Sequence, residues 1–288
     1  MTALIWGCAF VAQSIGMEYI GPFTFNGLRS LLGAVVLLPV IAVTRRKKTE
    51  EQKKSENPKT LLIGGICCGA ALTAATSLQQ IGLQYTSAGK AGFITALYIL
   101  IVPIMGLFLG KKAGMKVWMG VVLAVIGMYL LCIKEGFTIS KGDFLIFLCA
   151  IIFSVHILVI DHFSPKVDGV CLSCLQFFIC GAICSVFMFA IEKPSLDAVL
   201  AAWMPIGYAG VFSCGVAYTL QIIAQKNVAP TVASLLLSLE SVFSMLAGWV
   251  ILGERMSGRE LFGCFLVFAA VILAQLPEMQ KKGNMETV

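Results

Sequence analysis

A stripe of aromatic and hydrogen-bonding residues occurs twice in this sequence at helical spacing. The first copy consists of Trp6, Phe10, Gln13 and Met17, and the second, 143 residues later, of Cys149, Phe153, His156 and Ile160. Spacings of three and four residues place each set on one face of a helix. The amide of Gln13 and the imidazole of His156 could therefore line a shared cavity for a polar or amphiphilic molecule. The alternative is that each makes a hydrogen bond between helices.

Two more stripes carry hydroxyl, thiol and amide groups. They consist of Thr73, Ser77, Gln80 and Gln84, and of Cys214, Tyr218, Gln221 and Gln225. Lipid cannot satisfy amide groups, so these faces are expected to point at protein or water. They either line a pathway or join helices through polar contacts worth about 1 kcal/mol each.

Two full charges, Arg29 and Glu240, lie inside long apolar runs. A charge near the centre of a bilayer costs about 3 kcal/mol or more, so both side chains are expected to face other helices or water. With a cytoplasmic N-terminus, Arg29 lies about 10 Å below the outer end of its segment and Glu240 about 16 Å from the inner end of its own. These depths allow a fixed salt bridge, direct or through water. The alternative is a role in substrate binding or proton coupling.

Groups typical of enzymes and metal sites are sparse. Cys171 and Cys174 form one CxxC without a second cysteine pair or a histidine at ligand spacing, so no metal or redox centre is expected. Of the two histidines, His156 lies within an apolar run and His162 at its end, beside Asp161. A membrane enzyme would need a carboxylate cluster with a metal, or a histidine paired with a nucleophile or acid. We therefore expect no catalytic residues and no cofactor.

The composition places these residues in a membrane. Of 288 residues, 59% are apolar and only 12% charged, with a mean hydropathy of +0.93, whereas soluble domains carry about 25% charged residues. A soluble globular, disordered or coiled-coil protein is thereby excluded. The net charge of +6 does not indicate nucleic-acid binding, because seven of the 21 Lys and Arg residues fall between residues 44 and 59, as in a cytoplasmic loop.

Ten apolar runs are long enough to cross a bilayer, which needs about 17 to 25 residues. They cover approximately residues 2–18, 23–43, 60–82, 88–109, 115–133, 142–162, 170–191, 200–223, 229–252 and 258–276. The first run lacks the basic flank and cleavage site of a signal peptide. The sequence therefore predicts an all-α integral membrane protein with ten transmembrane helices.

An internal repeat relates the two halves of the chain. A shift of 143 residues pairs Phe10 with Phe153, Glu18 with Asp161, Pro22 with Pro165, Gly110 with Gly253 and Gly120 with Gly263. A shift of 142 pairs Leu78-Gln79 with Leu220-Gln221. Because each half holds five segments, an odd number, the second half must be inverted in the membrane. Many secondary transporters have this architecture, with the binding site near the midplane.

The expected boundaries follow from this repeat. The first half covers residues 1–134, the second 142–276, and residues 277–288 form a tail. With the N-terminus inside, 14 Lys and Arg residues lie on the cytoplasmic side and six outside. The positive-inside rule therefore favours both termini in the cytoplasm and a multi-pass protein of the inner (plasma) membrane.

Several short motifs recur in a specific order over almost the whole chain. The first half has Trp6-Gly7, Phe10, Pro22, Arg29, the stretch from Tyr85 to Phe93, Pro103 and Leu109-Gly110. The second half has Pro165, Ala233-Ser234, Leu239-Glu240, Leu252-Gly253-Glu254-Arg255 and Gly263. In order and spacing these motifs resemble the drug/metabolite transporter superfamily, in particular the ten-helix branch in which each half is an EamA domain.

Two positions depart from the pattern of that family. Gly110-Lys111 stands where the family often has Gly-Glu, and Glu240-Ser241 stands where it often has Glu-Pro. Without that proline, the ninth segment is expected to lack a helix distortion.

The resemblance implies a small-molecule carrier, commonly an exporter of amino acids or related metabolites, that works without nucleotide hydrolysis or a cofactor. The candidate substrate-binding residues are Trp6, Phe10, Gln13, Ser77, Gln80, Phe153, His156, Tyr218, Gln221 and Glu240. Arg29 and Glu240 are the candidates for a charge pair or for coupling. A lipid or lysolipid flippase on the same scaffold is an alternative, and a lipid-modifying membrane enzyme is less favoured. Monomer and homodimer both stay open.

Overall fold

The computed structural model describes residues 1–47, 57–86, 88–111, 114–132, 140–252 and 257–275, and the regular elements within these ranges are all helices. Residues 48–56 of the basic loop, the motif from Gly253 to Arg255 and the tail at 277–288 lie outside the described residues. In the first half the helices are α1 (Thr2–Gly16), α2 (Pro22–Lys47), α4 (Pro58–Leu83), α5 (Ala88–Thr95), α6 (Tyr98–Phe108) and α7 (Met115–Cys132). In the second half they are α8 (Lys141–Phe163), α9 (Gly169–Phe187), η1 (Met188–Glu192), α10 (Leu196–Ala201), α11 (Trp203–Tyr208), η2 (Ala209–Tyr218), α12 (Thr219–Gln225), α13 (Pro230–Leu237), α14 (Leu239–Leu252) and α15 (Gly258–Gln275).

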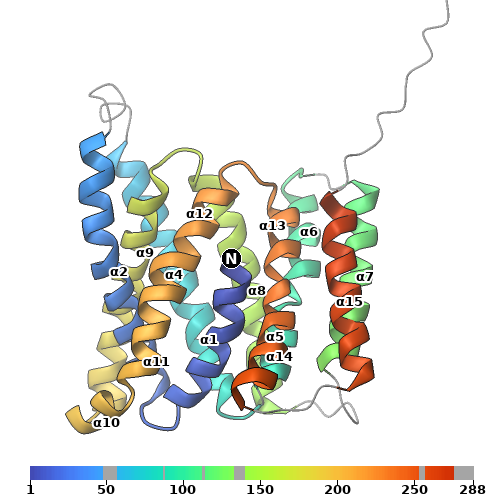
Figure 1. Ribbon diagram of the computed structural model, residues 1–288. Coiled ribbons are helices and arrows are strands. Elements are labelled where there is room, and N and C mark those ends of the chain that lie inside the picture. The colour runs from blue at the N-terminus through green and yellow to red at the C-terminus, as the bar shows by residue number, and fades with distance from the viewer. Residues whose placement is uncertain (48–56, 87, 112–113, 133–139, 253–256, 276–288) are drawn as a thin grey trace, which may run out of the picture.

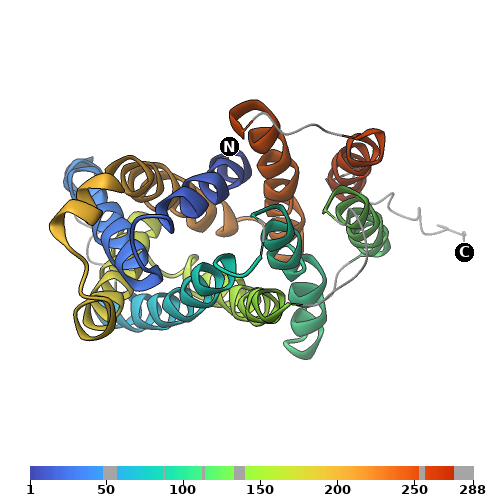
Figure 2. The same ribbon diagram turned by 90° about the horizontal axis from the view of Figure 1, so that it is seen from below.

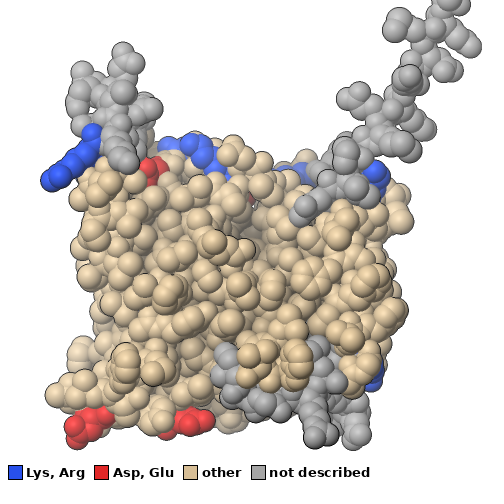
Figure 3. All heavy atoms as spheres, viewed as in Figure 1, with Lys and Arg blue, Asp and Glu red and all other residues tan. Residues whose placement is uncertain are grey.

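Seven helical stretches within the described part of the chain are long and apolar enough to cross a membrane. They are Pro22–Arg46, Pro58–Leu83, Ala91–Phe108, Lys141–Phe163, Gly169–Glu192, Trp203–Gln225 and Pro230–Ala247, and three shorter apolar helices cover Thr2–Gly16, Met115–Leu130 and Leu261–Ala274. The coloured charged side chains lie toward the upper and lower ends of the molecule, with a belt of uncharged residues between them (Figure 3). The chain is therefore a multi-pass, all-helical membrane protein.

The helices pack into one bundle with a separate pair at one end (Figures 1 and 2). Helix α1 packs on α14, and α8 packs on α4 and on α5 and α6. Helices α2 and α9 pack together on one side, and α7 packs against α15 at the other end. Around the middle of the bundle, α1, α8, η2 and the junctions of α5 with α6 and of α13 with α14 approach one another.

Side-chain caps fix several helix starts, among them those of α8 and α2. Ser140 and Asp143 form a capping box at the start of α8, in which Ser140 Oγ accepts from the Asp143 amide at 3.1 Å and Asp143 Oδ2 accepts from the Ser140 amide at 2.7 Å. At α2, the cap comes from the other half of the chain: the Glu192 carboxylate accepts from the Phe23 and Thr24 amides at 2.9 and 2.7 Å. A carboxylate at a helix N-terminus is also stabilised by the helix dipole.

The prediction that the ninth segment lacks a helix distortion is wrong, because the helix is interrupted there: α13 ends at Leu237 and α14 begins at Leu239. Serine hydroxyls, and not a proline, account for this interruption. Ser234, Ser238 and Ser241 each donate to the carbonyl three residues earlier, at 2.7 to 2.8 Å, and such bonds compete with the helix ladder and bend helices. The expected fourth segment is likewise divided, between Thr95 and Tyr98.

The α7–α15 pair depends on close contact between small residues. A Cβ atom added at Gly127 would lie 2.8 Å from the Gly263 carbonyl oxygen and 2.9 Å from Leu266 Cβ. One added at Gly120 would lie 3.0 Å from the Ala270 carbonyl oxygen. Small residues at such crossings let helix backbones approach closely inside a membrane.

We expect Gly127→Ala to lower the stability of this pair, because the methyl group would meet backbone atoms that cannot rotate away. Overpacking of this kind costs about 1 to 3 kcal/mol. The matched control is Gly207→Ala in α11, where an added Cβ meets nothing within 4 Å and helix propensity favours alanine by up to about 1 kcal/mol. Melting temperatures of the two variants should move in opposite directions; a Gly127→Ala protein as stable as the control would contradict the close contact.

Candidate functional site

A small cavity lined by polar, aromatic and aliphatic side chains lies near the middle of the bundle. It offers about 40 Å³ to the centres of water molecules. Its wall is formed by Trp6, Ala9, Phe10, Gln13, Arg29, Gln79, Thr95, Tyr98, Phe153, His156, Ile157, Ser213, Tyr218, Gln221, Leu237 and Glu240. Ligand pockets usually measure about 300 to 1,000 Å³, so this cavity is much smaller than a pocket that buries a metabolite.

Aromatic rings form one part of the wall. The ring centroids of Trp6 and Tyr218 lie 4.5 Å apart, and those of Phe153 and His156 lie 6.4 Å apart. His156 also meets the edge of Tyr218, with centroids 6.1 Å apart. Tyr218 is the last residue of η2, a π-helical segment, and such segments are frequent at functional sites because they reorient side chains.

Several polar groups around the cavity are held by neighbours. The Nε2 atom of His156 lies 3.0 Å from Gln176 Oε1, and Gln79 Nε2 donates to Thr95 Oγ1 at 3.2 Å. Gln221 Nε2 donates to Gln225 Oε1 at 2.9 Å. These bonds fix the orientation of an imidazole and two amides at the wall.

Other polar atoms at the wall are buried without a hydrogen-bond partner in the structure. They are Trp6 Nε1, a donor, and Gln13 Oε1 and Gln221 Oε1, both acceptors. A buried polar group without a partner costs about 1 to 3 kcal/mol. The residues of the wall thus carry one donor and two acceptors whose hydrogen-bonding capacity is unused in this structure.

The two buried charges line the same cavity but do not form an ion pair within 4.0 Å. Glu240 Oε1 instead accepts from the Tyr98 hydroxyl at 2.8 Å. The described residues place no hydrogen bond or carboxylate on the Arg29 guanidinium, which lies 5.4 Å from the centroid of the Phe25 ring. The direct salt bridge allowed by the sequence is therefore absent, because a tyrosine from the α6 start satisfies Glu240.

The structure brings most of the predicted residues together and leaves two outside. Those in the cavity wall are Trp6, Phe10, Gln13, Arg29, Phe153, His156, Tyr218, Gln221 and Glu240. Gln80 is fully buried behind the wall and donates to the Gln13 carbonyl at 3.2 Å. Ser77 is half-buried on α4 and is also absent from the wall. Both were expected at the site because they share a helix stripe, but the stripe faces other helices.

Four polar wall residues were not among the predicted ones: Gln79, Thr95, Tyr98 and Ser213. Gln79 had a usable signal, because the 142-residue shift pairs it with Gln221. The same shift pairs Tyr98 with Glu240. Thr95 and Ser213 depend on the helix break after α5 and on the π-helical turn of η2, which the apolar pattern did not reveal.

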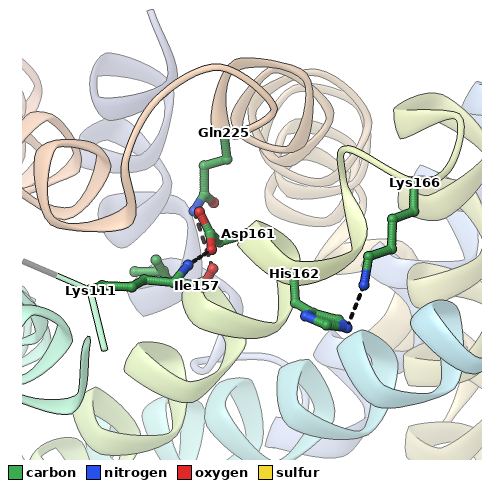
Figure 4. Close-up of polar contacts among 6 residues, drawn as sticks. All are labelled: Lys111, Ile157, Asp161, His162, Lys166 and Gln225. Atoms are coloured by element: carbon green, nitrogen blue, oxygen red, sulfur yellow. Dashed lines mark hydrogen bonds and ion pairs between the residues drawn. The ribbon is translucent and has the colours of Figure 1, made fainter. Parts of the chain in front are cut away.

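A polar cluster joins the ends of α8 and α12 to Lys111, which follows α6 in the sequence (Figure 4). Lys111 forms an ion pair with Asp161 at the end of α8. Gln225, which is bonded to Gln221 of the wall, donates through Nε2 to the Ile157 carbonyl at 3.2 Å. Next to this cluster, a hydrogen bond joins Lys166 Nζ and His162 Nε2 at 2.7 Å. The cluster links the cavity to this end of the bundle and holds three helices together there.

His156 and Asp161 have the spacing of an HxxxxD pattern, which would pair an imidazole with an acid. Five residues correspond to about 140° round a helix, so the two side chains diverge. His156 contacts Gln176 inside the bundle, whereas Asp161 pairs with Lys111 at its end. Within the described ranges, no group of three His, Cys, Asp or Glu residues is placed to hold a metal ion. The pattern therefore does not form an acid–imidazole pair.

Comparison with known proteins identifies the family. Residues 1–133 and 140–276 match the EamA-like transporter family. The chain belongs to this family. An uncharacterized transporter of Archaeoglobus fulgidus is 31% identical over 278 residues, covering 96% of this chain and 84% of the relative. The uncharacterized transporter YoaV of Bacillus subtilis is 24% identical over 94% of this chain and 92% of its own length.

The fold also has a relative among solved structures. One crystal structure superposes with a TM-score of 0.74 at 20% identity, covering 95% of this chain and 96% of the other. A WAT1-related chloroplastic protein of Arabidopsis thaliana is 26% identical over 95% of this chain and 67% of its own length. This EamA-family chain is therefore a membrane transporter by kinship, with a cavity at the centre of its bundle.

Proposed function

We propose that this protein is a secondary transporter of small polar or amphiphilic metabolites, such as amino acids or related compounds, and that it exports them by alternating access between two inverted five-helix halves. The observation that carries the proposal is the pairing of wall residues. Shifts of 143 or 142 residues relate Phe10 to Phe153, Gln13 to His156, Gln79 to Gln221 and Tyr98 to Glu240, and all eight line one cavity. In inverted-repeat transporters the substrate site lies between the repeats.

Contacts between equivalent positions support a two-fold relation. Tyr98 and Glu240, equivalent under the 142-residue shift, are hydrogen-bonded to each other at 2.8 Å. Two equivalent positions can meet in this way only near the axis that relates the halves. In the α7–α15 pair, Gly120 approaches Ala270 and Gly127 approaches Gly263, and the 143-residue shift exchanges these two contacts. These contacts support a cavity at the interface between the proposed halves.

The position of Arg29 supports the proposal that the substrate carries an anionic group. Arg29 is 4% exposed and lines the cavity, and its guanidinium has no carboxylate partner among the described residues. A carboxylate could form charge-assisted, bidentate hydrogen bonds with it. Trp6 Nε1, Gln13 Oε1 and Gln221 Oε1 supply unpaired polar atoms, and the aromatic rings supply apolar surface for the rest of the molecule.

The small volume supports a state in which the pathway is narrow, between two more open ones. A cavity of about 40 Å³ must expand before it admits a metabolite. We propose that the end closed by Lys111, Asp161 and Gln225 faces the cytoplasm, with both termini on that side, because the excess of Lys and Arg lies there. Opening at this end would admit substrate, and opening at the other would release it.

We expect Lys111→Asp to open this end more often. The substitution replaces the ion pair with Asp161 by two carboxylates, which repel each other. Lys111 is 40% exposed and Asp161 15%, so the pair is worth at most about 1 kcal/mol, or roughly fivefold in population. The readout is alkylation of a Ser213→Cys reporter in the cavity wall, mapped by mass spectrometry to separate it from the native cysteines. Alkylation should be a few-fold faster in the variant.

The exchanged variant, Lys111→Asp with Asp161→Lys, is the matched control because it restores the opposite charges. It should return the alkylation rate of Ser213→Cys toward that of the parent. Equal rates in the parent, Lys111→Asp and exchanged proteins would show that the ion pair does not limit access to the cavity.

A thermal-shift screen of the purified full-length protein tests the proposed substrate class. The panel contains amino acids, nucleobases, polyamines and lysolipids, because a ligand stabilises the state that binds it, by about 2.7 kcal/mol at 100 times its Kd. We expect stabilisation by compounds that carry a carboxylate, and no stabilisation by polyamines. A response to lysolipids alone would favour the flippase alternative and overturn the metabolite proposal.

A further inference from the structure

A second hollow lies on the outside of the bundle, away from the central cavity, between α2, α9 and the start of α4. This α2–α9 groove offers about 430 Å³ to the centres of water-sized molecules. Along α2 its wall runs from Leu31 through Val35, Leu38 and Ile41 to Arg45, at the three- and four-residue spacings of one helix face. On the facing side, Cys174, Leu175 and Phe178 of α9 complete an apolar surface.

No part of the described chain covers the apolar floor of this groove. Val35 and Phe178 are each 59% exposed and Leu38 is 55% exposed. The distance from Leu31 to Arg45 is fourteen residues, or about 21 Å along the helix. The hydrocarbon of one leaflet is about 15 Å deep, half of a core of about 30 Å. The groove is therefore long enough to hold an acyl chain through one leaflet.

The mouth of the groove is basic. Arg45 belongs to its wall, Arg46 follows in the sequence, and Lys59 lies in the first turn of α4. Between residues 44 and 59 the chain carries seven Lys and Arg against three Glu, a net charge of +4. Basic clusters directly after a membrane helix attract anionic lipid, with about 1 kcal/mol per basic residue near the surface.

We propose that the α2–α9 groove binds an anionic phospholipid, with one acyl chain along α2 and α9 and the phosphate at Arg45. An apolar groove alone would accept any lipid. A guanidinium at its mouth favours a phospholipid whose headgroup carries no cation to balance the phosphate. The lipid would touch the two helices that carry Arg29 and Gln176, and so would stabilise their packing. This site is independent of the transported substrate and does not rest on the proposed function.

The full-length protein in neutral detergent, with phosphatidylglycerol or phosphatidylcholine added, tests the charge preference. Phosphatidylglycerol should raise the melting temperature more than phosphatidylcholine does. Arg45→Gln should remove this difference, whereas Arg46→Gln, which makes the same charge change beside the groove, should keep most of it. Melting without added lipid verifies that both exposed substitutions leave the fold intact. Equal effects of the two lipids, or equal losses in both variants, would overturn the site.

Native cysteines give a second readout of the position of the lipid. Cys174 lines the groove and is partly exposed, and Cys67 is exposed on α4 outside the groove. Phosphatidylglycerol should slow alkylation of Cys174 by N-ethylmaleimide at least threefold and leave Cys67 unchanged. Equal protection of both thiols, or protection of Cys174 that depends on protein concentration without lipid, would overturn the proposal; the latter would indicate a second copy of the chain in the groove.

Discussion

Replacing Arg29 with methionine is expected to abolish transport and to stabilise the protein. The guanidinium is buried at the cavity without a carboxylate partner in the described structure, and an unpaired charge at this depth costs about 3 kcal/mol. Its contact with the Phe25 ring, 5.4 Å from centroid to guanidinium carbon, returns only about 0.5 to 2 kcal/mol. Methionine removes the cost and fills a similar volume, so the melting temperature should rise by several degrees.

The expected loss of transport also follows from the absence of a carboxylate partner for Arg29 in the described structure, which leaves the guanidinium available to a substrate. If Arg29 binds the anionic group of the substrate, its removal forfeits about 3 kcal/mol, or more than 100-fold in the transport rate at low substrate concentration. Rates in proteoliposomes and melting temperatures are measured on Arg29→Met and on Arg46→Gln, an arginine change outside the cavity. A destabilised Arg29→Met protein would show that Arg29 is a structural group with a partner, and unchanged transport would remove it from the substrate site.

Glu240→Gln is expected to spare folding and to flatten the pH dependence of transport. Glu240 accepts a hydrogen bond from Tyr98, and none of the described residues places a cation within ion-pair distance of it. The amide oxygen of glutamine can accept the same bond, so the free energy of unfolding should change by no more than about 1 kcal/mol. A carboxyl group between the halves can bind and release a proton as access alternates, whereas an amide cannot.

Tyr98→Phe is the matched variant, because it removes the donor and keeps the carboxyl group. It should cost about 1 to 3 kcal/mol of stability, because it leaves a buried acceptor without its donor, and should leave transport dependent on pH. Proteoliposome transport measured across pH, alongside melting temperature, separates the two variants. A Glu240→Gln protein that is strongly destabilised would indicate a structural charge, and one with unchanged melting and unchanged pH-dependent transport would leave Glu240 without either role.

The sequence located the cavity wall where a helix face has one dominant polar stripe. Gln13 and His156 share a face with aromatic residues and a position in the repeat, and the structure places both in the wall. The stripe of Ser77 and Gln80 gave a wrong prediction, because amide side chains also join helices. The amide of Gln80 donates to the backbone of α1 and does not reach the cavity wall. Gln79, only about 100° round the helix, is the one at the cavity.

Partners of the two charges could not be predicted from depth alone. Arg29 and Glu240 have compatible depths, but an ion pair requires side chains that point at each other. The breaks after Thr95 and at Ser238 place Tyr98 and Glu240 near the first residues of α6 and α14, where they meet. At the break at Ser238, serine hydroxyls bond to carbonyls of their own helix, and an apolar pattern does not record this local competition.

Alternating access through the central cavity is tested most directly by reaching one wall position from each side of the membrane. A Ser213→Cys reporter is exposed to an impermeant maleimide in right-side-out and in inside-out vesicles, with its alkylation mapped by mass spectrometry. We predict alkylation from both sides, slowed from both by the compound that most stabilises the purified protein. Alkylation from one side only, or from neither, would contradict a transport pathway through this cavity.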